Sequence, residues 1–177
     1  EAIRSYGFGS GASRLVTGNM KLHRELEDKI CEFKETEGCL VFNSGYTANV
    51  GIISALVKKG DIVFCDKLNH ASITDGIILS RAEFKRYPHR DINTLEVLLK
   101  KSVKFRRRLI VSDSVFSMDG DIAPLDKLIE LAQRYNCLLM IDEAHATGVL
   151  GKKGKGVLEY LGLEDKNSDI IQMGTLS

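Results

Sequence analysis

The strongest constraint on the fold of this chain is a repeated alternation between short apolar runs and longer segments with helical periodicity. Leu22, Leu26, Ile30 and Phe33 recur at spacings of three or four residues, which puts them on one face of a helix over about 21–35. Further helices are expected at 47–59, 71–82, 92–101 and 125–135, and strands at 61–66, 83–87, 107–113, 137–142 and 169–174, with a short apolar run at 39–42. Strands that are apolar throughout, separated by amphipathic helices, predict an α/β fold with a mostly parallel sheet covered by helices on both faces.

Polar residues stand where several of these predicted strands end, namely Asn43, Asp66, Asp113 and Asp142. The carboxyl ends of parallel strands share one edge of a sheet, and ligands of such sheets bind beyond that edge. The functional site is therefore expected at this edge.

The charge balance argues against nucleic acid or an anionic membrane as partner, because 25 basic residues face 24 acidic ones. No apolar run approaches the roughly 20 residues that span a bilayer, and no basic-then-apolar leader opens the chain, so a cytoplasmic protein is expected. The four cysteines, Cys31, Cys39, Cys65 and Cys137, form neither a C-x-x-C pair nor a zinc pattern. Three of them lie in apolar runs and are expected to be small core residues in a reducing compartment, and no metal site is predicted.

The letters "DEAH" at 142–145 spell the box of a nucleic-acid helicase, but the rest of the chain does not support that function. A nucleoside triphosphatase needs a glycine-rich loop that ends in Gly-Lys-Ser/Thr, and this pattern is absent. The glycine-rich "GFGSGAS" at 7–13 follows no predicted strand, so it is not a dinucleotide fingerprint either. The "GKKGKG" loop at 151–156 is better explained as a solvated turn than as a phosphate loop.

The position of Asp142 at the end of a buried strand suggests that it pairs with a cation. A carboxylate at the end of a buried strand is poorly solvated unless a cation or several donors meet it, and a protonated heteroaromatic nitrogen is such a cation. Taken alone, Asp142 could equally cap a turn or pair with a lysine. His145 lies three residues later and could reach the same cavity, or simply form a hydrogen bond within its loop.

Three further segments place suitable groups at the same edge. In "NSGYTAN" at 43–49 a predicted strand ends at Asn43 and turns into a helix, whose free N–H groups favour an anion such as phosphate; a plain turn capped by Ser44 or Thr47 is the alternative. In "DKLNHASITDG" at 66–76, His70 begins a helix and could stack on a flat ring or act as a cap. In "SVFSMDGDIAPL" at 114–125, Ser117 supplies a free hydroxyl.

A phosphate cradle, a stacking histidine, a hydroxyl and an aspartate facing a pyridinium together describe a site for pyridoxal 5'-phosphate. The segments "YGFGSGASRLVTGN", "SGYTAN", "LNHASITDG", "VFSMDGDIAPL", "DEAHATGVLG" and "GTLS" resemble, in that order, those of the α-oxoamine synthase family. The resemblance covers nearly the whole chain. It implies the large domain of the aspartate aminotransferase fold (fold type I), incomplete in this sequence.

The resemblance also implies roles for individual residues. Asp142, His70 and His145 are the expected catalytic residues: Asp142 pairs with the ring nitrogen, and His70 stacks over the pyridine ring. Ser117 and His145 contact the cofactor near its phenolic oxygen. The cofactor-binding set is completed by residues at its phosphate end and at the end of the chain: Ser44, Gly45, Tyr46, Thr175 and Ser177. One departure is Ser114, where relatives usually carry glycine, and it is expected to leave these roles untouched.

The sequence is expected to be a piece of a longer protein. Residues 1–177 correspond to a partial cofactor-binding large domain, and the N-terminal arm and the C-terminal small domain of the family are absent. The Schiff-base lysine of the family follows "GTLS" directly, whereas this sequence stops at Ser177. An interrupted enzyme and an inactive scaffold subunit of the same family both remain as interpretations, and the match at the other cofactor positions favours the enzyme.

The family condenses an amino acid with an acyl-CoA and releases carbon dioxide, and its members are homodimers with active sites at the interface. The "SGYTAN" and "GSGASRLVTGN" segments look most like members that join L-alanine to pimeloyl-CoA in biotin synthesis, with the glycine acetyltransferases of threonine breakdown as the alternative. Amino acid, acyl-CoA and a second copy of the chain are therefore the expected partners.

Overall fold

The structure, a computed structural model, describes residues 1–165 and 170–176. By its internal contacts the chain divides into two compact units, Glu1–Val41 and Phe42–Ser177. The first contains the helices α1 (Ala2–Tyr6) and α2 (Lys21–Lys34), and α2 confirms the helix predicted over about 21–35. The second contains all the strands of the described residues and the remaining helices.

The apolar run at 39–42 is not a strand, so the expectation that a strand ends at Asn43 is wrong. The backbone at Val41 bonds to side chains instead of a neighbouring strand: its N–H donates to Glu27 (3.0 Å) and its carbonyl accepts from Arg14 (2.9 Å). Arg14 and Glu27 in turn form an ion pair at 2.7 Å, and Glu27 is buried. The apolar character of residues 39–42 alone could not reveal that this charged pair provides the hydrogen bonds of the Val41 backbone.

The second unit is built on a parallel sheet. Its strands are β1 (Ile62–Asp66), β2 (Glu83–Tyr87), β3 (Arg108–Asp113), β4 (Leu138–Asp142) and β5 (Ile170–Met173). They lie in the order β2-β1-β3-β4-β5, and each neighbouring pair is parallel. These strands confirm the predicted ones, except that residue 169 of the last prediction lies outside the described residues.

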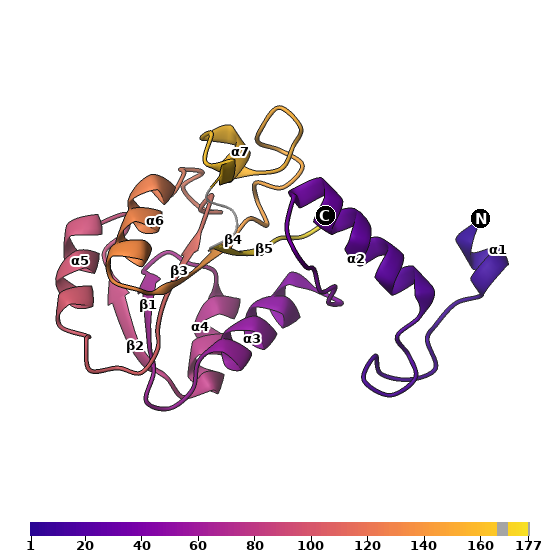
Figure 1. The fold of residues 1–177 in the computed structure, drawn as a ribbon, viewed down its shortest axis with the longest axis horizontal. Coiled ribbons are helices and arrows are strands. Elements are labelled where there is room, and N and C mark those ends of the chain that lie inside the picture. Colours follow the sequence, from indigo (N-terminus) through magenta and orange to yellow (C-terminus); the bar gives the residue numbers. More distant parts are fainter. Residues whose placement is uncertain (166–169, 177) are drawn as a thin grey trace. The chain divides into compact units, whose positions relative to one another are not determined.

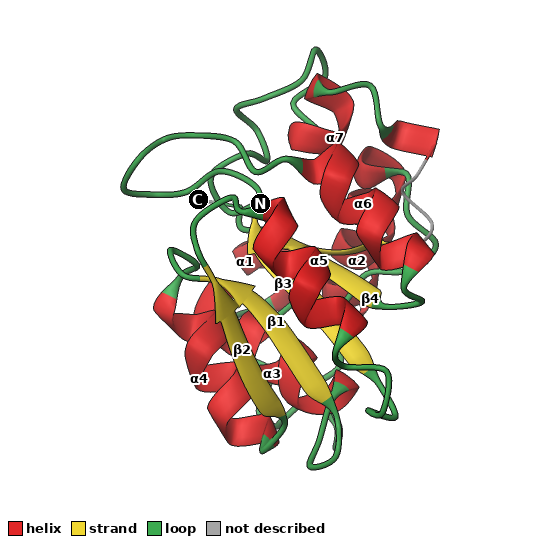
Figure 2. Cartoon of the chain, turned by 90° about the vertical axis from the view of Figure 1, so that its left-hand side faces the viewer, coloured by secondary structure: helices red, strands yellow, loops and turns green. Residues whose placement is uncertain are grey.

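The helices of this unit are α3 (Gly45–Leu56), α4 (Ala71–Ser80), α5 (Ile92–Lys100), α6 (Leu125–Arg134) and the short α7 (Val157–Tyr160). The first begins two residues before its prediction, because Ser44 caps it, and ends at Leu56, before the predicted end at 59. Figure 1 shows α5 and α6 on one side of the sheet and α3 and α4 on the other, and Figure 2 shows the same layers from the side.

Each strand sends alternate side chains into two separate cores, as the two-residue period of a strand requires. In β1, Phe64 packs with residues of α5 and α6, while Val63 packs with residues of α3 and α4. In β4, Leu139 joins the first core and Met140 the second. The predicted sheet with helices on both faces is therefore confirmed.

Within the described residues all four cysteines are free, and only Cys65 is fully buried. No helix there is long and apolar enough to cross a bilayer. Those residues also contain no cluster of side chains suited to a metal ion.

Candidate active site

The side chain of Asp142 forms the floor of the candidate site. Asp142 is the last residue of β4, is 5% exposed and lies beside Asp113, its register partner on β3. One carboxylate oxygen accepts the backbone N–H of Ala144 at 2.9 Å, and the other accepts the side-chain amide of Asn49 at 2.8 Å. Among the described residues no lysine or arginine pairs with it. The carboxylate thus caps a turn, as one reading of the sequence allowed, yet it is buried without a cation.

Asn49 is a site residue to which the sequence analysis gave no role. It lies on α3, is 1% exposed, and its Nδ2 donates both to Asp142 and to the hydroxyl of Ser72 at 2.9 Å. Its Oδ1 is buried and has no hydrogen-bond partner among the described residues. The available signal was a single amide at an inward position of an otherwise apolar helix, because a buried polar side chain needs partners.

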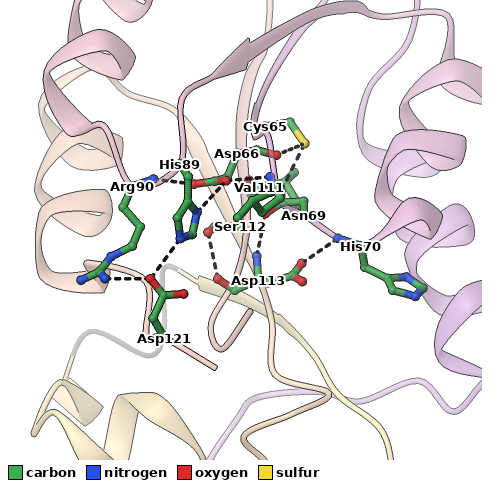
Figure 3. A network of polar contacts seen from close by, with 11 residues as sticks. Cys65, Asp66, Asn69, His70, His89, Arg90, Val111, Ser112, Asp113 and Asp121 are labelled. Atoms are coloured by element: carbon green, nitrogen blue, oxygen red, sulfur yellow. Dashed lines mark hydrogen bonds and ion pairs between the residues drawn. The ribbon is translucent and has the colours of Figure 1, made fainter. Parts of the chain in front are cut away.

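His70 is joined to Asp142 through these two residues. It is the N-cap of α4: its Nδ1 accepts the backbone N–H of Ser72 at 3.3 Å and lies 2.7 Å from the Ser72 hydroxyl. The capping role left open by the sequence is therefore observed. The residue is exposed, and Figure 3 shows its ring directed away from Asp113, to which only the backbone N–H of His70 is bonded, at 3.3 Å. The free face of the ring can still contact a flat ligand.

Asp113 is the second acid at this edge. Burial, followed by the negative charge of Asp142, raises the pKa of Asp113 from 3.8 to about 7. A carboxyl group with this pKa exists in both protonation states at neutral pH. The floor of the site therefore holds two acids side by side that resist carrying two negative charges at once, which favours a cationic ligand.

The turn before α3 lies at the same edge as Asp142. Ser44 is the N-cap of this helix, and its Oγ accepts the N–H of Thr47 at 3.1 Å. Gly45 lies directly against Thr175, which follows β5: a Cβ on Gly45 would stand 2.8 Å from the Thr175 methyl carbon. The glycine thus permits a close approach between the helix N-terminus and the end of β5, and an anion at this point meets free N–H groups and the positive end of the helix dipole.

The other predicted site residues form no side-chain hydrogen bond to Asp142 among the described residues. Tyr46 is 53% exposed, and its hydroxyl donates to Asp75 of α4 at 2.9 Å. Ser117 is exposed in the loop between β3 and α6, and His145 is exposed in the turn after β4. The Thr175 hydroxyl donates to the carbonyl of Ala144, two residues beyond Asp142, at 3.4 Å.

Side-chain hydrogen bonds therefore link Asp142 to Asn49, Asn49 to Ser72, and Ser72 to His70. The turn after β4 is hydrogen-bonded to Thr175, which in turn lies against Gly45. Among the described residues, neither Ser117 nor His145 forms a side-chain hydrogen bond with this group, and Ser177 lies outside the described residues.

Ser114 is more closely involved than the sequence indicated. It is fully buried, and both its backbone N–H and its Oγ donate to the carbonyl of Asp142, at 2.8 and 2.9 Å. The hydroxyl that replaces the usual glycine hydrogen adds a hydrogen bond to the residue on the floor of the site. These bonds reach the backbone carbonyl of Asp142 and not its carboxylate, so the expectation that this departure leaves the site roles untouched stays a prediction.

The glycine-lysine loop at 151–156 uses its amides internally. The N–H groups of Lys153 and Lys155 donate to the carboxylate of Glu159 at 2.8 and 3.0 Å. A carboxylate in this position competes with phosphate, which agrees with the interpretation as a turn.

The residues present fit pyridoxal 5'-phosphate at both of its ends. A buried carboxylate and the Oδ1 of Asn49, which have no cation and no hydrogen-bond partner respectively among the described residues, mark the place for a protonated ring nitrogen and its surroundings. A helix N-terminus with a close-packed glycine marks the place for the phosphate.

Comparison with known proteins agrees with this fit. Residues 1–177 match the family described as aminotransferase class I and II. The chain is 60% identical, over 97% of its length and 44% of the relative's, to an 8-amino-7-oxononanoate synthase of Citrifermentans bemidjiense. Among solved structures it resembles a serine palmitoyltransferase from S. paucimobilis with bound PLP-myriocin, with TM-score 0.89, 39% identity, and coverage of 93% of this chain and 42% of that one.

It also resembles an 8-amino-7-oxononanoate synthase from Francisella tularensis, with TM-score 0.75, 33% identity, and coverage of 97% of this chain and 44% of that one. The chain thus spans less than half the length of the proteins it matches.

Proposed function

The chain belongs to the aminotransferase class I and II family, and we propose that it is the cofactor-binding part of an α-oxoamine synthase that uses pyridoxal 5'-phosphate. The proposed enzyme is an acyltransferase that joins an amino acid to an acyl-CoA with loss of carbon dioxide. Its substrates are L-alanine and pimeloyl-CoA, and its products are 8-amino-7-oxononanoate, CoA and carbon dioxide, a step of biotin biosynthesis. It acts in the cytoplasm as a homodimer.

The choice of substrates is supported by the balance of the similarities. Identity is 60% to a relative named 8-amino-7-oxononanoate synthase and 39% to the serine palmitoyltransferase, each over more than nine tenths of this chain. The solved structures alone do not favour this choice, because the serine palmitoyltransferase is 39% identical to the chain and the Francisella 8-amino-7-oxononanoate synthase is 33% identical. Identity at the level of side chains bears more directly on which substrates are used.

The observation that carries the proposal is the buried Asp142 carboxylate. Within the described part of the chain two N–H donors hold this buried carboxylate, and a positive charge that enters beside it stabilises it. The bound cofactor supplies a ring that withdraws electrons from the substrate carbon and so stabilises negative charge there. Asp142 keeps the ring nitrogen protonated, which strengthens that withdrawal.

The other residues orient the reacting groups. The N-terminus of α3 at Gly45, together with Thr175, would hold the phosphate, and the exposed ring of His70 would cover one face of the pyridine. By resemblance to the family, Ser117 and His145 would contact the phenolic oxygen. The lysine that moves the substrate α-proton follows Ser177 by resemblance to the family.

The cofactor part of the proposal is tested by titrating the purified full chain with pyridoxal 5'-phosphate. We expect a visible absorbance band that borohydride abolishes, with the label recovered on one lysine in the peptide after "GTLS". A protein that binds the cofactor but gives no borohydride-sensitive label would be the inactive scaffold subunit, and a protein that binds no cofactor would contradict the proposal.

The substrate part is tested by pairing alanine, glycine and serine with pimeloyl-, acetyl- and palmitoyl-CoA and measuring the release of CoA thiol. We expect alanine with pimeloyl-CoA to give the highest kcat/KM. Faster reaction of glycine with acetyl-CoA would identify a glycine C-acetyltransferase instead, and faster reaction of serine with palmitoyl-CoA would identify a serine palmitoyltransferase.

A further inference from the structure

A second group of charged residues lies next to the candidate site and is centred on His89, which follows β2. Its Nδ1 is 3.1 Å from Oδ1 of Asp66, at the end of β1, and its Nε2 is 3.0 Å from Oδ2 of Asp121 (Figure 3). An ionised carboxylate can only accept hydrogen bonds, so both contacts are hydrogen bonds only when both ring nitrogens carry hydrogen. The arrangement therefore suits the positively charged form of the imidazole.

The residues around His89 also favour the positively charged imidazole. Asp66 is 2% exposed, and its other oxygen accepts the backbone N–H of Arg90 at 2.8 Å. The Arg90 guanidinium donates to Asp121 at 2.8 Å, and the ring of Phe116 meets the imidazole edge to face at 4.4 Å. Burial by itself lowers the pKa of His89, but the hydrogen bonds and charges of Asp121 and Asp66 outweigh it and raise the pKa.

Asp121 and Phe116 belong to the loop that carries Ser117. This loop, residues 114–123, connects β3 to α6 and is closed by backbone bonds: the N–H of Phe116 donates to the carbonyl of Asp121 at 3.0 Å, and the N–H of Gly120 donates to that of Phe116 at 2.8 Å. His89 thus contacts the loop on both sides of its tip, once before Ser117 and once after it.

Phe116 and Ala123 pack in the core, and hydrogen bonds to other segments hold the 114–123 loop at two places. Its first residue, Ser114, is bonded to the carbonyl of Asp142. Its far side is held through the Asp121 side chain, whose Oδ2 receives His89 and Arg90, whereas its buried Oδ1 has no hydrogen-bond partner among the described residues. The side chain of Asp121 is therefore fixed by the cations beside it.

We propose that the imidazolium of His89, bonded between Asp66 and Asp121, is a positioning residue that fixes the 114–123 loop and so holds the Ser117 hydroxyl at the cofactor. The part of this proposal that concerns the cofactor depends on the proposed function. The part that concerns the loop does not, because it follows from contacts within the chain.

The loop is tested by amide hydrogen exchange on the full chain without cofactor, from about pH 6 to about pH 9, after correction for the chemical effect of pH on exchange. We expect protection of the amides of 114–123 to fall as the pH rises through the pKa of His89. His89→Gln removes the charge, so its loop should exchange about tenfold faster near neutral pH and show no such pH dependence. His23→Gln is the matched control, because glutamine can keep the cap that His23 gives the N–H of Met20.

Asp121→Asn is the second variant. It keeps the ion pair between His89 and the buried Asp66, so it can test the proposal even if His89→Gln does not fold. It should lose the same pH dependence. Wild-type exchange of the 114–123 loop in either folded variant would overturn the proposal.

Cofactor binding is measured on the same proteins by titration with pyridoxal 5'-phosphate. We expect a dissociation constant about tenfold higher for His89→Gln than for His23→Gln, with the difference shrinking at high pH, where the wild-type imidazole is itself neutral. A loosened loop with unchanged cofactor affinity would overturn the positioning role. A loosened loop in a protein that binds no cofactor in any form would instead contradict the proposed function and leave the loop contact standing.

Discussion

At the scale of single residues, the candidate site depends most on a carboxylate whose surroundings are hydrogen-bonded but not neutralised. Asp142 receives one amide from Asn49 and one backbone N–H from Ala144. Two neutral donors orient a carboxylate without matching its charge. The residue is therefore fixed in place and still able to attract a cation.

Asp142→Asn should leave the fold intact and lower turnover on the order of 10²–10³-fold, because it removes the negative charge that keeps a ring nitrogen protonated. Turnover and far-ultraviolet circular dichroism measure the two parts of this expectation. Asp126→Asn, at an exposed position on α6, is the control. Turnover close to that of the control would show that Asp142 does not have the assigned role.

The raised pKa of Asp113 predicts a specific dependence of stability on pH. The folded-state pKa of about 7 lies above the ordinary value of 3.8, so the folded protein binds this proton more tightly than the unfolded chain. Its stabilising contribution is thus present at low pH and is lost as the pH rises from about 4 to about 7. Asp113→Asn should remove this loss, which is at most about 1.4 kcal/mol per pH unit.

Urea denaturation of the cofactor-free protein at several pH values measures this difference in the free energy of unfolding. If wild type and Asp113→Asn lose stability in parallel across the range, Asp113 does not carry the proton.

The sequence could identify residues whose chemistry is unusual where they stand, such as an acid at the end of an apolar run. Asp142 was found in that way, and the structure brings it together with His70, Gly45 and Thr175 at one edge. Asn49 was missed because its importance comes from two partners, on α4 and β4, that are distant in sequence. The role of His89 was missed for the same reason, since the two carboxylates that it contacts lie on β1 and on the loop after β3.

At the scale of elements, periodicity was sufficient where an element packs on the sheet. The strands of the sheet are apolar on both faces because each has a layer of helices on either side, and this is the pattern that the sequence displayed. The run at 39–42 has similar composition, but a strand also needs a neighbour to pair with. Composition does not encode that neighbour, and the Val41 backbone bonds instead to Arg14 and Glu27.

The junction between α3 and the end of β5 depends on the absence of one carbon atom. A Cβ on Gly45 would approach the Thr175 methyl carbon to 2.8 Å, so Gly45→Ala should destabilise the fold by about 1–3 kcal/mol and weaken binding of a phosphate at this turn. Adding Thr175→Ser removes that methyl group and keeps the hydroxyl, and the double variant should recover most of the loss.

Thermal denaturation and cofactor titration measure both effects at Gly45. Gly38→Ala is the control, because a Cβ there meets nothing within 4 Å. A double variant no better than Gly45→Ala would show that the close approach to Thr175 is not the reason for glycine.

At the scale of the whole molecule, the chain provides one layered unit with the candidate site at the carboxyl edge of its sheet, together with the smaller unit of residues 1–41. The chain spans 44% of the length of the Citrifermentans relative. By resemblance to the family, we expect residues of a second copy to complete the active site.

We therefore expect the full chain to sediment as a homodimer and to lose specific activity when diluted below the dissociation constant of the dimer. Sedimentation velocity and activity measured over the same concentration series test this. A monomer with full activity at the highest dilution would contradict a site shared between subunits.

Asp113 and Asp142 lie side by side at the ends of β3 and β4, so binding of a cationic cofactor is expected to be coupled to the loss of a proton. The pKa of Asp113, raised to about 7, places its titration close to neutral pH. A cation that settles beside Asp142 would favour the ionised form of Asp113, so we expect a proton to be released as the cation binds. The heat of loading should then vary with the ionisation enthalpy of the buffer, and mild acidity should shift the equilibrium toward the cofactor-free protein by mass action alone.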